Sequence, residues 1–136
     1  MQRKSSRGTF VVGSWLVTWN TLILAQGFFP VRKFTRTLFD LYYAPLQLVW
    51  LISTVILVGF VVGSFELLKL KEFGRSLVIF IAVIDIPHLI VGKAIFNNYG
   101  IQPMYIRNFF LIPVSVVLDF AIVYFLHRPD VRKQFS

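Results

Sequence analysis

The segment LQLVWLISTVILVGFVVGSFELL, residues 46–68, is an almost unbroken apolar run and decides the class of fold. A hydrocarbon core about 30 Å thick needs about 20 apolar residues in helical form, so this run predicts a membrane-spanning α-helix. Three more apolar stretches of similar length predict three more spans. The chain is therefore expected to be an all-α, polytopic membrane protein. The four predicted spans cover residues 9–29, 46–68, 76–96 and 106–126.

The link between the first two predicted spans has a different pattern. Pro30 ends the first span. Arg32, Lys33 and Arg36 follow, and the apolar residues among and after them recur at helical spacing. This pattern predicts an amphipathic helix over residues 31–44 that lies at the membrane interface. Residues 1–136 are expected to form a single transmembrane domain with four transmembrane helices.

Composition narrows the range of functions. Apolar residues make up 57% of the chain and charged residues 15%, whereas a soluble domain usually has about a quarter charged. The net charge of +8 could suggest nucleic acid, but the Lys and Arg residues cluster at the ends of apolar runs, as they do at the cytoplasmic flanks of membrane helices. We therefore expect no nucleic-acid partner. There is no cysteine, which excludes disulfides, thiol catalysis and thiolate metal sites.

The distribution of Lys and Arg predicts the orientation. With four spans, nine of the 14 basic residues fall on one side and five on the other, which favours cytoplasmic N- and C-termini. The larger set is Arg3, Lys4, Arg7, Lys69, Lys71, Arg75, Arg128, Arg132 and Lys133, and the smaller set is Arg32, Lys33, Arg36, Lys93 and Arg107.

Two stretches carry a resemblance to a known group of proteins. Residues 67–75, LLKLKEFGR, form a leucine-lysine turn before the third span, and residues 124–135, YFLHRPDVRKQF, close the chain. Together they resemble small bacterial inner-membrane proteins with four helices and no assigned function. Phe73 and Gly74 stand where that group has tryptophan and alanine. The resemblance covers the last two-thirds of the chain; it implies the topology and the bacterial inner membrane, and supplies no catalytic residue.

Four basic residues are predicted to anchor the cytoplasmic face. Lys69, Lys71 and Arg75 at the turn, and Arg128 at the end of the last span, are expected to bind lipid phosphates. Docking to a partner is the alternative for the same residues.

Polar residues inside the predicted spans form the candidate site. Asp85 and His88 lie three residues apart in the third span, on one helical face, and Asp119 lies in the fourth. A rise of about 1.5 Å per residue puts Asp85, Asp119 and Asn20 roughly 12–16 Å deep and His88 roughly 20 Å deep. These residues are predicted to share one intramembrane polar layer, with Thr54 a few ångströms further out.

Three interpretations of this layer remain open. The residues could hydrogen-bond across helices and specify the packing, meet a polar group of a partner, or carry protons. One His and two Asp could hold a divalent ion, but their spacing is not diagnostic, so no metal or other cofactor is predicted. Gly59 and Gly63 form a GxxxG, for which a contact within the chain and one with another chain are equally open.

These patterns favour a non-catalytic protein, because no phosphate loop, HExxH or nucleophile signature is present. We expect an accessory or structural subunit, or an assembly factor, of a larger membrane complex, in contact with lipids and other integral membrane subunits. The alternative is a homo-oligomeric transporter or proton/ion-conducting protein that uses the Asp/His layer. A hole-forming membrane protein is a third, weaker interpretation.

Overall fold

The computed structural model describes residues 7–28, 44–98 and 106–135. Every secondary-structure element in these ranges is an α-helix, which confirms the predicted all-α class. The predicted interfacial helix lies outside the described residues, apart from Ala44, which begins α3. The helices are α1 (Arg7–Phe28), α3 (Ala44–Leu68), α4 (Glu72–Asn98), α5 (Ile106–His127) and the short α6 (Pro129–Arg132).

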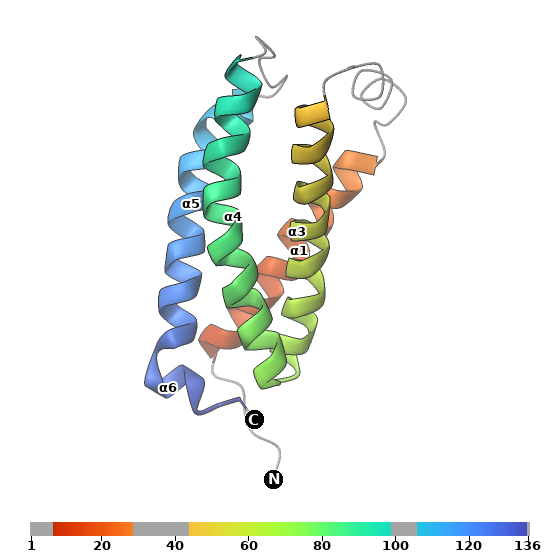
Figure 1. Cartoon of the computed structure of the whole chain (residues 1–136). Helices are drawn as coiled ribbons and strands as arrows, with labels where there is room; N and C mark the ends of the chain where they lie inside the picture. Colours follow the sequence, from red (N-terminus) through yellow and green to blue (C-terminus); the bar gives the residue numbers. More distant parts are fainter. Residues whose placement is uncertain (1–6, 29–43, 99–105, 136) are drawn as a thin grey trace.

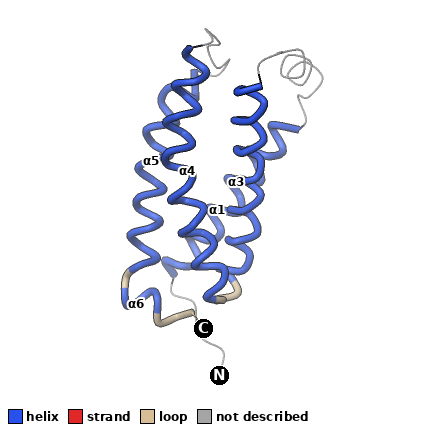
Figure 2. Tube along the Cα trace, in the orientation of Figure 1, coloured by secondary structure: helices blue, strands red, loops and turns tan. Residues whose placement is uncertain are grey.

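The four long helices form an up-and-down bundle. Consecutive long helices run in opposite directions, and α1 is inclined to the other three (Figure 1). α4 packs between α3 and α5, while α1 packs on α3. The described residues outside helices are confined to the α3–α4 turn and the segments on either side of α6 (Figure 2).

Two of the described helices are long and apolar enough to cross a membrane. The qualifying windows are Leu51–Leu68 in α3 and Glu72–Ile95 in α4, and α5 contains a shorter apolar stretch, Pro113–His127. Less than a third of each window is buried inside the protein (28% and 22%), so most of its residues are at least partly exposed. α4 begins one turn earlier than predicted, because Glu72 occupies its first turn, where a carboxylate suits the positive end of a helix dipole.

The GxxxG pair of α3 lies against α4. A Cβ added at Gly59 would approach the side chain of Ile81 to 2.8 Å, and one at Gly63 would approach that of Val78 to 2.9 Å. Small residues one turn apart thus let α3 and α4 come close together. Of the two alternatives for this motif, the structure therefore shows the contact within the chain.

The turn from α3 to α4 closes with a Schellman motif. The amide of Leu70 donates to the carbonyl of Leu67 (2.9 Å) and that of Lys71 to the carbonyl of Glu66 (3.1 Å). Leu70 takes the left-handed position, with φ of 56°, where glycine is usual. The customary apolar contact of this motif is replaced by an ion pair, since Lys71 Nζ lies 2.5 Å from Glu66 Oε2. The turn is therefore held by backbone and charge together.

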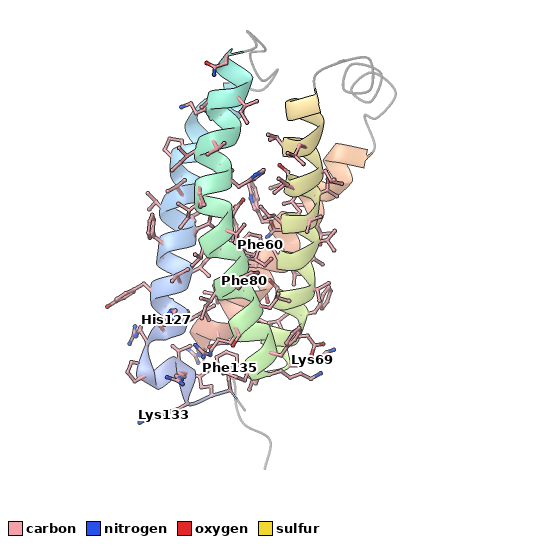
Figure 3. The ribbon with its side chains drawn as sticks, in the orientation of Figure 1. Phe60, Lys69, Phe80, His127, Lys133 and Phe135 are labelled. Atoms are coloured by element: carbon pink, nitrogen blue, oxygen red, sulfur yellow. The ribbon has the colours of Figure 1, made fainter. Side chains whose placement is uncertain are left out.

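The most completely buried side chains gather at this same end of the bundle. Leu67, Val78 and Leu126 are fully buried there, and Val131 and Phe135 join them from the segment after α5. Lys69, Lys133 and Phe135 all lie at this end (Figure 3). This end also carries the basic residues of the α3–α4 turn, of the first turns of α1 and α4, and of the C-terminal segment, so we call it the basic end. Its described members are Arg7, Lys69, Lys71, Arg75, Arg128, Arg132 and Lys133.

Candidate functional site

Asp85 of α4 and Asp119 of α5 meet where these two helices pack together. Their carboxyl groups are hydrogen-bonded to each other. Asp119 is 6% exposed, and Ala82 and Ile122, one turn away from the two carboxyls, belong to the buried core. A hydrogen bond between two carboxyl groups needs a proton between them, because an ionised carboxylate can only accept. The pair is therefore a contact between α4 and α5 that can form only when at least one carboxyl group is protonated.

One oxygen of Asp119 receives no hydrogen bond from a conventional donor. Within the part of the chain that the structure describes, Asp119 Oδ2 is buried and no N–H or hydroxyl group donates to it. A buried acceptor without a partner costs about 1–3 kcal/mol, and such an atom calls for an explanation. A proton shared with Asp85 would give this atom a partner.

His88 connects α4 to its other neighbour, α3. Its Nε2 lies 2.7 Å from Ser53 Oγ, and Ser53 Oγ also lies 2.8 Å from the carbonyl oxygen of Val49. A hydroxyl has one hydrogen, which Ser53 donates to Val49, so Ser53 accepts the hydrogen bond from His88. This arrangement makes Nε2 of His88 the donor to Ser53.

The polar contacts therefore cross three helices. Asp119 on α5 meets Asp85 on α4, and His88, one helical turn further along α4, meets Ser53 on α3. Between the two α4 residues lies Pro87, which has no N–H to donate to the carbonyl one turn earlier. We call Asp119, Asp85, His88 and Ser53 the polar track.

Only some of the residues predicted to share the polar layer lie together in the structure. It brings Asp85 and Asp119 together and sets His88 beside them on α4. Asn20 is buried at 6% exposure, but its Nδ2 donates to the carbonyl of Leu16 (2.8 Å) within α1, and no described contact joins it to the other three. Ser53 was not predicted, although its neighbour Thr54 was considered. An unbroken apolar run does not show how the helix is rotated about its axis, so the sequence does not reveal that the Ser53 hydroxyl meets α4.

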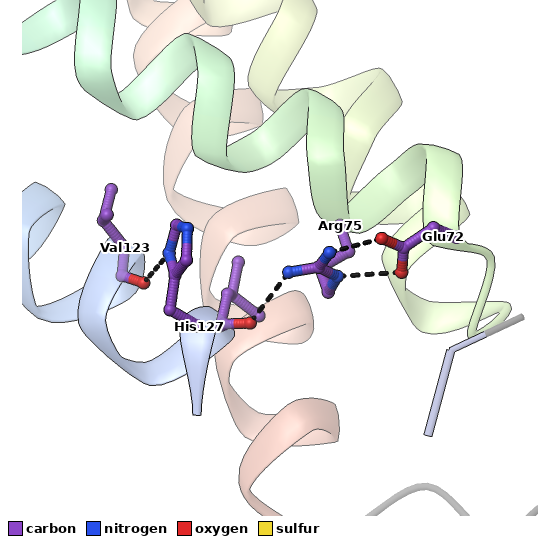
Figure 4. Close-up of polar contacts among 5 residues, drawn as sticks. Glu72, Arg75, Val123 and His127 are labelled. Carbon is purple, nitrogen blue, oxygen red and sulfur yellow. Dashed lines mark hydrogen bonds and ion pairs between the residues drawn. The ribbon is translucent and has the colours of Figure 1, made fainter. Parts of the chain in front are cut away.

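Arg75 is used within the protein. Its side chain is 9% exposed, its Nε donates to Glu72 Oε2 (2.8 Å), and Nη2 bonds the other oxygen of the same carboxylate (Figure 4). Its Nη1 donates to the carbonyl oxygen of Leu126 (3.1 Å), near the C-terminal end of α5. A guanidinium there satisfies one of the carbonyls that a helix end leaves without a partner. The structure thus gives Arg75 a different role from the predicted lipid anchor.

The other three predicted anchors remain at the surface. Lys69 and Lys71 are both more than half exposed and share the carboxylate of Glu66, and Arg128 is half exposed beside Asp130. Three cations thus face two carboxylates at this surface. They keep the exposure and the excess positive charge that binding to lipid phosphate would need.

The C-terminal segment is tied to the start of α1. Thr9 Oγ1 donates to Gln134 Oε1 (3.0 Å), and Gln134 Nε2 donates to the carbonyl oxygen of Asp130 (3.2 Å). Pro129 follows the end of α5 and starts α6, and Val131 and Phe135 are then buried in the core. This closure of the basic end was not predicted.

Comparison with protein-family models, with curated proteins and with solved structures found no match for this chain. The described residues contain no group of three His, Asp or Glu side chains placed to hold a metal ion. The function must therefore be inferred from the polar track and the outer surface.

Proposed function

We propose that the chain is an integral protein of the bacterial inner membrane in which all four long helices span the bilayer. α1 and α5 each have 22 residues, about 33 Å of helix, which matches a hydrocarbon core of about 30 Å. The outward-facing apolar side chains of α3 and α4 support the same placement. The basic end, where the described basic residues concentrate, faces the cytoplasm together with both termini.

Within that membrane the protein serves as a non-catalytic accessory or structural subunit, or an assembly factor, of a larger complex. The observation that carries this proposal is a stacked tryptophan pair on the outside of α1. The rings of Trp15 and Trp19 lie 5.4 Å apart at an interplanar angle of 8°, and the residues are 49% and 37% exposed.

The depth of this pair argues for a protein neighbour. Counted from Thr9, Trp15 lies roughly 9 Å and Trp19 roughly 15 Å into the span. Tryptophan favours the membrane interface, where its N–H meets water or headgroups, whereas the middle of the hydrocarbon core offers no acceptor. A partner subunit packed on α1 supplies apolar contact area and acceptors at this depth.

The polar track fits a structural role in such a subunit. Hydrogen bonds between helices in a membrane contribute only about 0.6 kcal/mol each on average. The contacts of Asp85 with Asp119 and of His88 with Ser53 therefore specify how α3, α4 and α5 are arranged more than they stabilise the bundle. A defined helix arrangement is what a docking surface on α1 requires.

A photo-crosslinking experiment tests the subunit proposal. A benzophenone amino acid is placed at Trp19 or, as the matched control, at Phe80, which is 60% exposed on α4. Irradiation in the native membrane is expected to join the Trp19 variant to one other polypeptide in defined yield and to leave the Phe80 variant uncoupled. Crosslinks to lipid alone, or equal products from both positions, contradict a partner on α1.

The second candidate function is proton or ion conduction by a homo-oligomer, which the Asp85–Asp119 contact favours. The substitutions Asp85→Asn and Asp119→Asn separate the two functions. Loss of proton flux in liposomes with assembly intact supports conduction. Unchanged flux with altered assembly supports the subunit.

A further inference from the structure

We propose that Asp85 and Asp119 form a proton-binding site inside the membrane, in which one exchangeable proton is held between the two carboxyl groups. The inference rests on the membrane placement of the proposed function and not on any partner. It also goes beyond a packing role, since it assigns a ligand to the polar track.

Contact and burial carry the proposal. The two carboxyls meet across the α4–α5 interface, and Asp119 is 94% buried, since 6% of it is exposed. A pair of ionised carboxylates at this depth would repel each other and would each lose hydration, so at least one proton must stay on the pair. The proton is thus a stoichiometric component of the α4–α5 contact.

The buried Asp119 oxygen supports a proton at this contact. Asp119 Oδ2 is buried and receives no hydrogen bond from an N–H or hydroxyl group in the described ranges. A carboxyl proton shared with Asp85 supplies the donor that such a buried acceptor needs.

The donor set fits a proton better than a metal ion. Calcium and magnesium take about six or more oxygen ligands, whereas a proton needs only two. Among the described residues, no third carboxylate or histidine joins the two aspartates in a metal-binding group. The site therefore has the chemistry for a proton.

The other ionisable groups on the packed helices lie at different distances along them; Glu72 and Arg75, for example, lie at the start of α4. His88 follows Asp85 by one turn on α4 and hydrogen-bonds Ser53, and Lys93 lies about two turns beyond Asp85. Glu66 on α3 and His127 on α5 lie toward the basic end, the latter about 12 Å along the helix from Asp119. His88 is thus the nearest group along the helix with which the pair could exchange its proton.

Labelling with dicyclohexylcarbodiimide tests the site. This apolar reagent enters the membrane and reacts with a protonated carboxyl: the carboxyl oxygen bonds the central carbon, and the proton passes to a reagent nitrogen. Intact mass and peptide mapping of the purified protein in liposomes are expected to show one adduct per chain, on Asp85 or Asp119. Labelling is expected to fall by about tenfold per pH unit once the shared proton is lost.

Controls make the result decisive. The double variant Asp85→Asn and Asp119→Asn is expected to lose the adduct, whereas Asp130→Asn, at an exposed carboxyl, is expected to keep it. Sodium at constant pH is expected to leave labelling unchanged. Protection by sodium would show a cation site in place of a proton site, and absence of an adduct, or an adduct that survives in the double variant, would also overturn the proposal.

A measurement on the unmodified protein covers the case in which the double variant does not fold. Infrared spectroscopy is expected to show the carbonyl stretch of a protonated carboxylic acid that shifts in D2O and disappears at alkaline pH. Absence of this band at neutral pH contradicts the proposal. Neither experiment depends on a partner, so failure of the proton site leaves the crosslinking test of the subunit proposal unaffected.

Discussion

Arg75 Nη1 donates a hydrogen bond of 3.1 Å to the carbonyl oxygen of Leu126, which joins the start of α4 to the end of α5. The same guanidinium is paired with Glu72, so one buried cation satisfies a carboxylate and a helix end together. Lys69 and Lys71, only a few residues away, stay exposed. Position in the fold therefore separates three basic residues that look alike in the sequence.

Replacing Arg75 by leucine is expected to lower stability by about 2–4 kcal/mol, because the carbonyl of Leu126 loses its donor while Glu72 loses its partner. Thermal unfolding in detergent micelles measures the effect. The matched control is Arg128→Leu, which breaks an exposed pair with Asp130 and is expected to change stability by less than about 1 kcal/mol. Equal shifts for the two variants contradict the role assigned to Arg75.

Gly74→Ala is expected to destabilise the α3–α4 turn by about 2 kcal/mol or more, although alanine is the better helix former by about 1 kcal/mol. A Cβ at Gly74 would lie 2.3 Å from the backbone nitrogen of Leu67, and this backbone cannot rotate away as a side chain can. Gly92→Ala serves as the control, since its Cβ would meet only a side-chain methyl of Val49 at 3.3 Å. An unchanged melting temperature for Gly74→Ala would show that the turn is more open than described.

Ser64→Ala is expected to leave stability unchanged or to raise it by up to about 1 kcal/mol. The Ser64 hydroxyl is buried and has no hydrogen-bond partner within the described residues, so its removal relieves a desolvated polar group. Unfolding by heat in detergent gives the comparison. Thr9→Val provides the contrast, because it removes the hydrogen bond to Gln134 and is expected to cost about 1 kcal/mol. A clear loss of stability for Ser64→Ala would reveal a partner for this hydroxyl.

The absence of cysteine allows a direct test of the four-span topology. Single cysteines are introduced as Lys69→Cys, Lys133→Cys and Asn98→Cys, and intact spheroplasts are treated with a membrane-impermeant maleimide. Asn98→Cys is expected to react at once, whereas the other two react only after the membrane is opened. Reaction of Lys133→Cys and Asn98→Cys from the same side would remove α5 from the spans.

Much of the fold follows from local pattern. The apolar runs predict the positions of the four long helices, because length and hydropathy are properties of consecutive residues. The packing of Gly59 against Ile81 was predicted only as one of two alternatives. Small residues indicate that another helix packs closely, but they do not indicate whether that helix belongs to the same chain. The closure by Val131 and Phe135 was missed, because a four-residue helix is too short to show a period.

Only part of the candidate site could be predicted from the sequence. Ionisable residues inside apolar runs are rare enough to stand out, which identified Asp85, His88 and Asp119. Which of these residues meet depends on how each helix is rotated about its axis. Hydropathy does not reveal this rotation when apolar residues surround the whole helix. The pairing of His88 with Ser53 and the separation of Asn20 from the others therefore required the structure.

The central claim is that this chain works as a subunit of a larger membrane assembly. Native mass spectrometry of the protein, extracted from its own membrane in mild detergent, tests it most directly. The account predicts a complex in which the chain occurs in fixed stoichiometry with at least one other polypeptide, and in which Trp15→Leu with Trp19→Leu abolishes that complex. A homo-oligomer without other polypeptides, unaffected by the tryptophan substitutions, would contradict the claim and favour proton conduction.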